Sequence, residues 1–195
     1  MDVAQAELAN NTEAADWGIL SELPGNPMMW VLILSELTAF GLFFLAFAVA
    51  RSLHPAIFAA GQAQLDILLG GVNTMVLITS GWLMALAVRA RADDHPEQAR
   101  RLTILAMAVG SLFVAVKIVE YGAKLDAGYG LEGDLFFTLY FLLTGFHFLH
   151  VLLGLAILGL VAWRNSLENL ETGAAFWHMV DLVWVVLYPL VYLVR

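Results

Sequence analysis

Five long apolar runs divide this chain, and each is long enough for a helix that crosses a membrane. At about 1.5 Å of rise per residue, a hydrocarbon core of roughly 30 Å needs about 20 residues. The first 26 residues are instead polar and acidic, and we expect a loosely ordered tail there. We therefore predict an all-α integral membrane protein in which residues 27–195 form a five-helix transmembrane bundle. The predicted helices cover about 27–50, 66–88, 102–122, 135–163 and 174–194.

Ionisable side chains interrupt these apolar runs. Each costs on the order of 3 kcal/mol in hydrocarbon on insertion scales, so it must face protein, water or a partner. Counting along the helices places one set in the same half of the membrane: Glu36, His147, His150, His178 and Asp181. A second set falls in the other half: Asn73, Lys117 and Glu120. We therefore expect two polar layers inside the bundle.

The last apolar run has one face that we expect the other helices to cover. Trp177, Asp181, Trp184 and Tyr188 follow the spacing i, i+4, i+7 and i+11, which places them on one side of a helix. We assign Trp177 and Trp184 packing roles on this face. Aromatic residues near the predicted membrane boundaries are also interpreted as interfacial anchors: Tyr121, Trp163, Trp177 and Tyr192.

The histidine pair His147 and His150 raises the question of a metal site. Two histidines at i and i+3 could bind a metal if Glu36, His178 or Asp181 supplied a third ligand. Hydrogen bonds across helices are the more common role of such residues in membrane bundles, and we predict no metal site. A haem site is also disfavoured, because it needs histidines on facing helices and only three of the five lie inside spans.

Glu36, the Lys117–Glu120 pair and two glycines are further residues for which the sequence predicts a role inside the bundle. Glu36 shares its helix face with Phe40, Phe43 and Phe47, so its carboxyl could move protons or hold the bundle together by a hydrogen bond. Lys117 and Glu120 are spaced i and i+3, and we expect a salt bridge between them. Small residues at Gly145 and Gly154 are expected to let helices approach closely.

Composition narrows the class of protein. The chain is 61 % hydrophobic and 13 % charged, far more apolar than a typical soluble domain. Its net charge of -8 and its scattered basic residues give no nucleic-acid surface, and we predict no nucleic-acid partner. Because there is no cysteine, the chain has no thiolate catalysis, disulfide or iron–sulfur cluster.

Basic residues also predict an orientation. Five arginines fall on the side of the bundle where the first helix begins: Arg89, Arg91, Arg100, Arg101 and Arg164. Three basic residues fall on the other side: Arg51, Lys124 and Arg195. Positive charge favours the cytoplasmic side, so we expect a cytoplasmic N-terminus and a periplasmic C-terminus.

Five sequence blocks, in order, resemble the helices of subunit III of the haem-copper oxidases. They are ILSELTAFGLFF, VNTMVLITSG, KIVEY, LTGFHFLHVLLG and WHMVDLVWVVLYPLVYL. Long members of that family have seven helices, and this chain resembles the short form that lacks the first two. Lys117 stands where oxidase members tend to carry Gln. The segment that leads into the first helix, PGNPMMWVLILSE, also looks most like that of the nitric-oxide-reductase-associated branch, the NorE type.

The resemblance implies a non-catalytic accessory subunit of a bacterial inner-membrane complex, with no redox centre of its own. Its partner would be the catalytic subunit of a nitric oxide reductase or, alternatively, of an aerobic cytochrome c or quinol oxidase. Glu36 matches the family's intramembrane glutamate, which is linked there to proton supply, and family members also hold phospholipid. Two other classes remain as alternatives. One is an independent proton-linked transporter, although we find neither inverted repeats nor broken helices, and the other is a membrane redox enzyme.

Overall fold

The computed structural model describes residues 26–194, and it is helical throughout apart from short turns and loops. Within that range, five helices are long and apolar enough to cross a membrane, which confirms the predicted all-α membrane bundle. They are α2 (Pro27–Leu53), α4 (Ile67–Ala92), α5 (Pro96–Asp126), α6 (Leu135–Arg164) and α7 (Leu167–Tyr188). A short helix, α3 (Pro55–Gln62), follows α2, and a π-helical turn, η2 (Pro189–Leu193), extends α7. Residues 1–25 of the expected tail lie outside the described residues.

Polar residues at the loop boundaries define where the helices begin. Asn26 caps α2 by accepting a hydrogen bond from the backbone N–H of Met28, and Pro27 occupies the first turn, where a missing N–H costs nothing. Asp66, Asp134 and Ser166 cap α4, α6 and α7 in the same way. The starts of these four helices are therefore encoded locally, next to the apolar runs.

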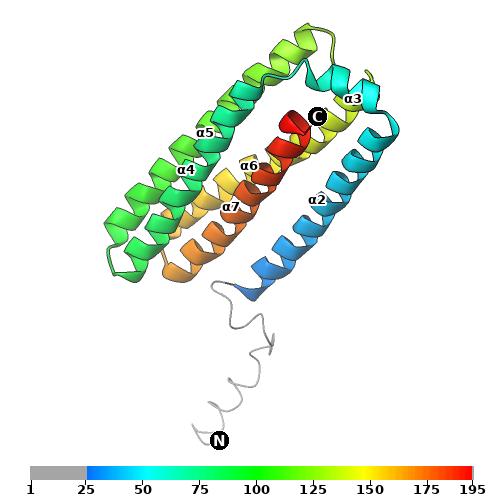
Figure 1. Cartoon of the computed structure of the whole chain (residues 1–195). Helices are drawn as coiled ribbons and strands as arrows, with labels where there is room; N and C mark the ends of the chain where they lie inside the picture. Colours follow the sequence, from blue (N-terminus) through cyan, green and yellow to red (C-terminus); the bar gives the residue numbers. More distant parts are fainter. Residues whose placement is uncertain (1–25, 195) are drawn as a thin grey trace, which may run out of the picture.

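The helices form two antiparallel hairpins with α2 beside them (Figure 1). One hairpin is α4 with α5 and the other is α6 with α7, and α7 also packs against α4 and α2. The central position of α7 is reflected in its burial. In the most apolar 18-residue stretch of the last span, 56 % of the residues are buried, against 17 % in the corresponding stretch of α2. The bundle is therefore organised around its last helix, and α2 is the helix most open to lipid.

The turns at one end of the bundle are fastened to each other. Nε of Arg91, in the last turn of α4, donates a 2.9 Å hydrogen bond to the carbonyl of Asn165. The Asn165 side chain in turn donates to the carbonyl of Pro96 at the start of α5, also at 2.9 Å. Asn165 has a left-handed backbone, with φ of 48°, which ends α6. We call this the arginine-rich end, because the five arginines named above lie in or beside these two turns.

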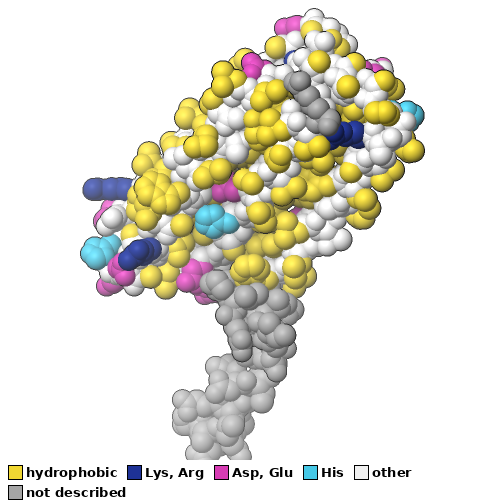
Figure 2. Space-filling model, viewed as in Figure 1, with side chains coloured by type: hydrophobic (Ala, Val, Ile, Leu, Met, Phe, Trp, Pro, Cys, Tyr) yellow, Lys and Arg dark blue, Asp and Glu magenta, His cyan; other side chains and the backbone are white. Residues whose placement is uncertain are grey.

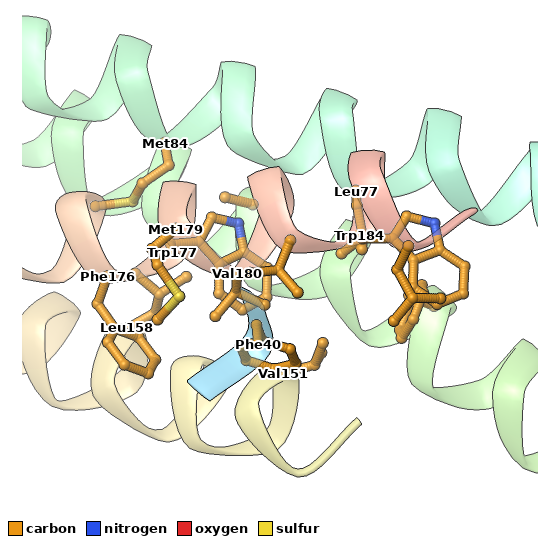
Figure 3. Packing of buried hydrophobic residues seen from close by; sticks show 14 of the residues in the cluster. Phe40, Leu77, Met84, Val151, Leu158, Phe176, Trp177, Met179, Val180 and Trp184 are labelled. Atoms are coloured by element: carbon orange, nitrogen blue, oxygen red, sulfur yellow. The ribbon is translucent and has the colours of Figure 1, made fainter. Parts of the chain in front are cut away.

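The core surrounds Trp177, which lies between α6 and α4 (Figure 3). Its ring is fully buried, and its Nε1 donates a 3.2 Å hydrogen bond to Oγ of Ser80 on α4. Two glycines make room for it: a Cβ at Gly154 would lie 2.7 Å from Cε3 of Trp177, and one at Gly110 would lie 2.7 Å from Cζ2. Gly145, by contrast, has no neighbour within 4 Å of its Cβ position. Only Gly154 of the two predicted packing glycines is at a close contact.

Several predicted features differ from the structure. Helix α7 begins at Leu167 rather than 174, since Ser166 caps a first turn that carries polar residues outside the apolar run. Helix α5 runs from Pro96, six residues before the predicted start, and α3 was not predicted. The interfacial role of Trp177 and Tyr192 is wrong, because both rings are fully buried, whereas Trp163 is 76 % exposed at the end of α6.

Candidate functional site

Glu36 and His150 form the first polar contact inside the membrane-spanning region. Oε2 of Glu36 on α2 lies 3.0 Å from Nε2 of His150 on α6. The other ring nitrogen, Nδ1, lies 2.9 Å from the carbonyl of Phe146, one turn earlier in α6. Phe40 packs edge-on against the imidazole, with ring centroids 5.2 Å apart. The pair therefore links α2 to α6 within an aromatic surround.

The 3.0 Å separation allows a hydrogen bond between the two side chains. A backbone carbonyl can only accept, so Nδ1 of His150 carries a hydrogen when it bonds to Phe146. The contact of Nε2 with Glu36 then needs a second proton. Either Nε2 donates to a carboxylate, or a protonated carboxyl donates to Nε2. Either arrangement forms a hydrogen bond that joins α2 to α6.

His147 is buried in a different environment. Neither of its ring nitrogens has a hydrogen-bond partner among the described residues. Its ring stacks on Trp184 at 5.2 Å and meets Phe113 edge-on at 5.7 Å. The structure thus separates the roles of the two histidines, since His150 pairs with Glu36 and His147 packs against α7 and α5.

His178 and Asp181 form a second contact, one turn apart on α7. Nδ1 of His178 lies 3.8 Å from Oδ2 of Asp181, which is ion-pair range and not hydrogen-bond range. The histidine side chain is 45 % exposed, whereas that of Asp181 is 11 % exposed. Gly81 on α4 makes room for the carboxylate, because a Cβ there would lie 2.2 Å from Oδ2. Asp181 is thus inserted against α4, and His178 lies at the surface.

Lys117 and Glu120 form the predicted pair, but within a larger cluster. Nζ of Lys117 donates to Oε2 of Glu120 at 2.9 Å, and also to the hydroxyls of Tyr140 at 3.2 Å and Tyr192 at 2.9 Å. Both hydroxyls donate to Oε1 of Glu120, at 2.8 Å and 2.6 Å. The cluster joins α5, α6 and η2.

Hydrogen bonding within this cluster is complete. The ammonium uses its three donors, and both carboxylate oxygens accept. Lys117 is fully buried, and its Nζ also lies 5.1 Å from the Trp184 ring centroid, a cation–π distance. A buried ion pair is tolerated only with such compensation. The arrangement is that of a structural junction.

Asn73, the third residue of the same expected layer, does not join the cluster. Its side chain is fully buried on α4, and neither its Oδ1 nor its Nδ2 has a hydrogen-bond partner among the described residues. The adjacent Thr74 does connect α4 to α7, since its hydroxyl accepts a 3.0 Å hydrogen bond from Nε1 of Trp184. Within residues 26–194, no three His, Asp or Glu side chains come together in a way that could hold a metal ion.

Sequence reasoning missed the polar groups that complete these contacts. Nothing in the sequence around Tyr140 indicates this role, and the position of Tyr192 predicts an interfacial anchor instead. Gln62, on the unpredicted helix α3, donates from Nε2 to the carbonyls of Val191 and Val194, both at 2.9 Å, and so holds the C-terminal turn. Sequence spacing offered no signal for these partners, because they lie between 20 and 132 residues apart.

An apolar groove lies beside His178, bounded by α2, α4 and α7. Its volume is about 510 Å³. Most of its lining is aliphatic or aromatic, and includes Trp30, Leu37, Ala85, Ala175 and Leu182. Glu171 and His178 are the ionisable side chains that line it. On the face shown in Figure 2, histidine and acidic side chains lie within a largely apolar surface.

Comparison with known proteins adds a family context. Residues 25–194 match the family described as cytochrome c oxidase subunit III. A protein of Synechocystis named cytochrome c oxidase subunit 3 is 33 % identical over 172 residues, which cover 84 % of this chain and 72 % of the relative. The protein of the same name from Thermostichus vulcanus is 30 % identical over 84 % of each chain.

A third relative has a different architecture. It is the Aeropyrum pernix protein named heme-copper oxidase subunit I+III, which is 31 % identical over 186 residues. The match covers 85 % of this chain but only 22 % of that protein. The region similar to this chain is therefore one part of a much longer polypeptide.

Proposed function

Because this chain belongs to the cytochrome c oxidase subunit III family, we propose that it is a non-catalytic subunit of a haem-copper complex. In this proposal it binds the catalytic subunit in the membrane and supports its assembly, stability or proton supply. It has no redox centre of its own, and the electron-transfer chemistry belongs to the partner. The family match supports this proposal by covering the whole bundle, residues 25–194.

The single observation that carries the choice of partner is the Aeropyrum pernix relative. Its name joins subunits I and III of a heme-copper oxidase in one chain. Because the two parts belong to one polypeptide, they stay at high effective concentration near each other. Two subunits in a stable complex are held together in a comparable way. For the present chain we propose the same contact between separate polypeptides.

Two candidates for the catalytic partner have different support. The relatives named cytochrome c oxidase subunit 3 favour an aerobic oxidase. The NorE branch, which associates with nitric oxide reductase, is favoured by Lys117 where oxidase members tend to carry Gln. The structure gives that lysine a specific setting, since it is fully buried with Glu120, Tyr140 and Tyr192.

Co-purification with haem distinguishes the two candidates. The tagged chain is purified from its native membranes in a mild detergent, and a reduced-minus-oxidised optical spectrum is recorded. An a-type haem signal identifies an oxidase partner, and b- and c-type haem without a-type identifies a nitric oxide reductase. Absence of haem from a folded preparation argues against both, and proton flux into liposomes that contain only this protein would then support the transporter alternative.

Glu36 and His150 are the residues that we assign to proton supply. Their contact lies inside a membrane-spanning region, and the two side chains are 24 % and 10 % exposed. A proton that can reside on either partner is suited to transfer towards a neighbouring subunit. Replacement of Glu36 by Gln tests this role.

We also propose that the chain resides in a bacterial inner membrane with its arginine-rich end in the cytoplasm. Since the sequence has no cysteine, single cysteines can report the orientation directly. Asp94→Cys lies in the α4–α5 turn, and Leu131→Cys lies in the α5–α6 loop at the opposite end. In intact spheroplasts, a membrane-impermeant thiol reagent should label only Leu131→Cys, and the reverse pattern would invert the proposed orientation.

Phospholipid is the one additional ligand that we propose. A groove of about 600 Å³ at the opposite end lies between α2, α3 and η2, and Arg51 and Leu190 are among its lining residues. An acyl chain fits such a surface, and the guanidinium can bind the phosphate at the membrane boundary. Mass spectrometry of the purified protein should find phospholipid, and Arg51→Gln should lower its amount.

A further inference from the structure

The chain enters the bundle beside the apolar groove that α2, α4 and α7 form. The backbone N–H of Asn26 donates a 3.0 Å hydrogen bond to Oγ1 of Thr172 on α7. Glu171, next to that threonine, lines the groove, and so does Trp30, about one turn after Asn26 on α2. The residues that precede Asn26 are therefore tethered at this end of the groove.

This end of the groove lies near the membrane boundary. The apolar run of the last helix begins at about residue 174, so Glu171 precedes it and His178 lies about 6 Å beyond its start. On α4, Val88 lines the groove and is followed directly by Arg89. A segment that reaches this end can therefore keep its polar groups in water while its apolar side chains enter the groove.

The last part of the N-terminal tail contains apolar side chains of suitable size. Trp17, Ile19, Leu20 and Leu23 stand in an otherwise polar and acidic segment, between 3 and 9 residues before Asn26. Large apolar side chains gain free energy when an apolar surface covers them. The tether keeps them at high effective concentration near the groove, and a loop this short costs little entropy to close.

Arg89 supplies a charge that the tail can match. It is exposed, lies about one turn after a lining residue of α4, and forms no ion pair within the described part of the chain. Asp16 and Glu22 stand on either side of most of the apolar stretch, and the tail carries no Lys or Arg. Because Glu171 lines the α7 side of the groove, electrostatic attraction favours the α4 side for these two acids.

We propose that the segment 17–23 folds back onto this groove and occupies it, with Asp16 and Glu22 towards Arg89. The segment then acts as a built-in lid that separates the groove and His178 from lipid headgroups. For these residues the inference departs from the loosely ordered tail expected from composition. It does not depend on the identity of the catalytic partner.

Photo-crosslinking of the full chain in its native membrane tests the location of the segment. The photoreactive residue p-benzoylphenylalanine replaces Leu20 and, in a separate control, Asn10 in the polar part of the tail. From position 20 we expect crosslinks within the same chain, found by mass spectrometry in the peptides that contain residues 85–88 or 175–182. From position 10 we expect no preferred site. Crosslinks from position 20 only to lipid, to another polypeptide or to α5 overturn the inference.

Reversal of single charges tests the contact with Arg89. Arg89→Glu should lower the yield of the crosslink from position 20 about fivefold, because the acids of the tail then meet a like charge. Arg101→Glu is the matched control, since Arg101 is also exposed but begins α5 on the other side of the turn, and the yield should not change. An equal yield in both variants overturns the charge contact.

Thiol labelling tests whether the segment covers the groove. Because the sequence has no cysteine, Ala85→Cys introduces a single thiol into the exposed part of the lining. In detergent, Leu20→Ser/Leu23→Ser should raise its rate of reaction with N-ethylmaleimide about fivefold. Ile104→Cys, at a similar distance from the α4–α5 turn and 52 % exposed on α5, should react at the same rate with either tail. An unchanged rate at position 85 overturns the lid.

Discussion

The hydroxyl of Tyr192 donates a 2.6 Å hydrogen bond to Oε1 of Glu120 and so fastens the C-terminal turn to α5. Tyr140 of α6 donates to the same oxygen at 2.8 Å, and Lys117 bonds to all three groups. Three parts of the bundle therefore meet at one buried carboxylate. The stability of that junction depends on the lysine and the glutamate being present together.

Removal of Lys117 should be strongly destabilising. Lys117→Met leaves the buried Glu120 carboxylate without its cation, and breaking a buried pair in this way costs about 3–5 kcal/mol. Unfolding in a mixed detergent series measures the change in free energy. The double variant Lys117→Gln/Glu120→Gln has no uncompensated charge and keeps hydrogen-bonding groups, so it should be more stable than the single variant. A single variant as stable as wild type would show that the cluster does not act as a junction.

Two glycines of α6 should respond in opposite ways to the same substitution. Gly154→Ala places a Cβ 2.7 Å from Trp177 and should destabilise the chain by about 1–3 kcal/mol, a usual cost of overpacking. Gly145→Ala meets nothing within 4 Å and should be neutral or slightly stabilising. Thermal unfolding of the two variants in one detergent makes the comparison. Equal stability of both variants would contradict the close packing around Trp177.

Glu36→Gln tests whether the Glu36–His150 pair supports the partner or is essential to it. The amide can still donate a hydrogen bond to Nε2 of His150, so folding should be unaffected. It cannot release a proton, so we expect the turnover of the purified complex to fall modestly, by about twofold or less. Complete loss of turnover in a normally assembled complex would contradict an auxiliary role.

Asp181→Leu should weaken both the fold and its association with the partner. The carboxylate occupies space beside Gly81 of α4 and accompanies His178, so leucine removes a polar contact and crowds the glycine. We expect the free energy of unfolding to fall by about 1–2 kcal/mol. The change is measured as a lower melting temperature in detergent. Asp181→Asn, of nearly equal size, is the matched control and should be milder. Unchanged stability of Asp181→Leu would argue against a buried structural role.

The sequence predicted the spans well because membrane helices are marked by long apolar runs. It also predicted the Lys117–Glu120 salt bridge, since partners at i and i+3 share a helix face. It could not predict Tyr140 and Tyr192 as their partners, because hydrogen bonds between distant helices depend on how those helices rotate and pack. Tyr192 is fully buried, although its position near the end of the last helix predicts a place at the membrane surface.

Depth counting was less informative than helix rotation. It groups Glu36, His147, His150, His178 and Asp181 by distance from one membrane side. The structure pairs Glu36 with His150 and places His178 3.8 Å from Asp181. His147 lies one turn away on the same helix, about 60° around its axis, and that rotation is enough to direct its ring to Trp184. The depth of a polar residue can be counted from the sequence. Its hydrogen-bond or packing partner can be identified only from the packed bundle.

The most direct test of the central claim is to measure where the haem resides in the purified complex. The tagged chain is isolated with its partner, the subunits are separated under conditions that retain haem, and the haem content of each fraction is measured. We predict that haem co-purifies in a fixed ratio to this chain and then stays entirely with the other subunit. Haem retained by this chain alone, or a folded preparation with no haem at all, would contradict a non-catalytic subunit of a haem-copper complex.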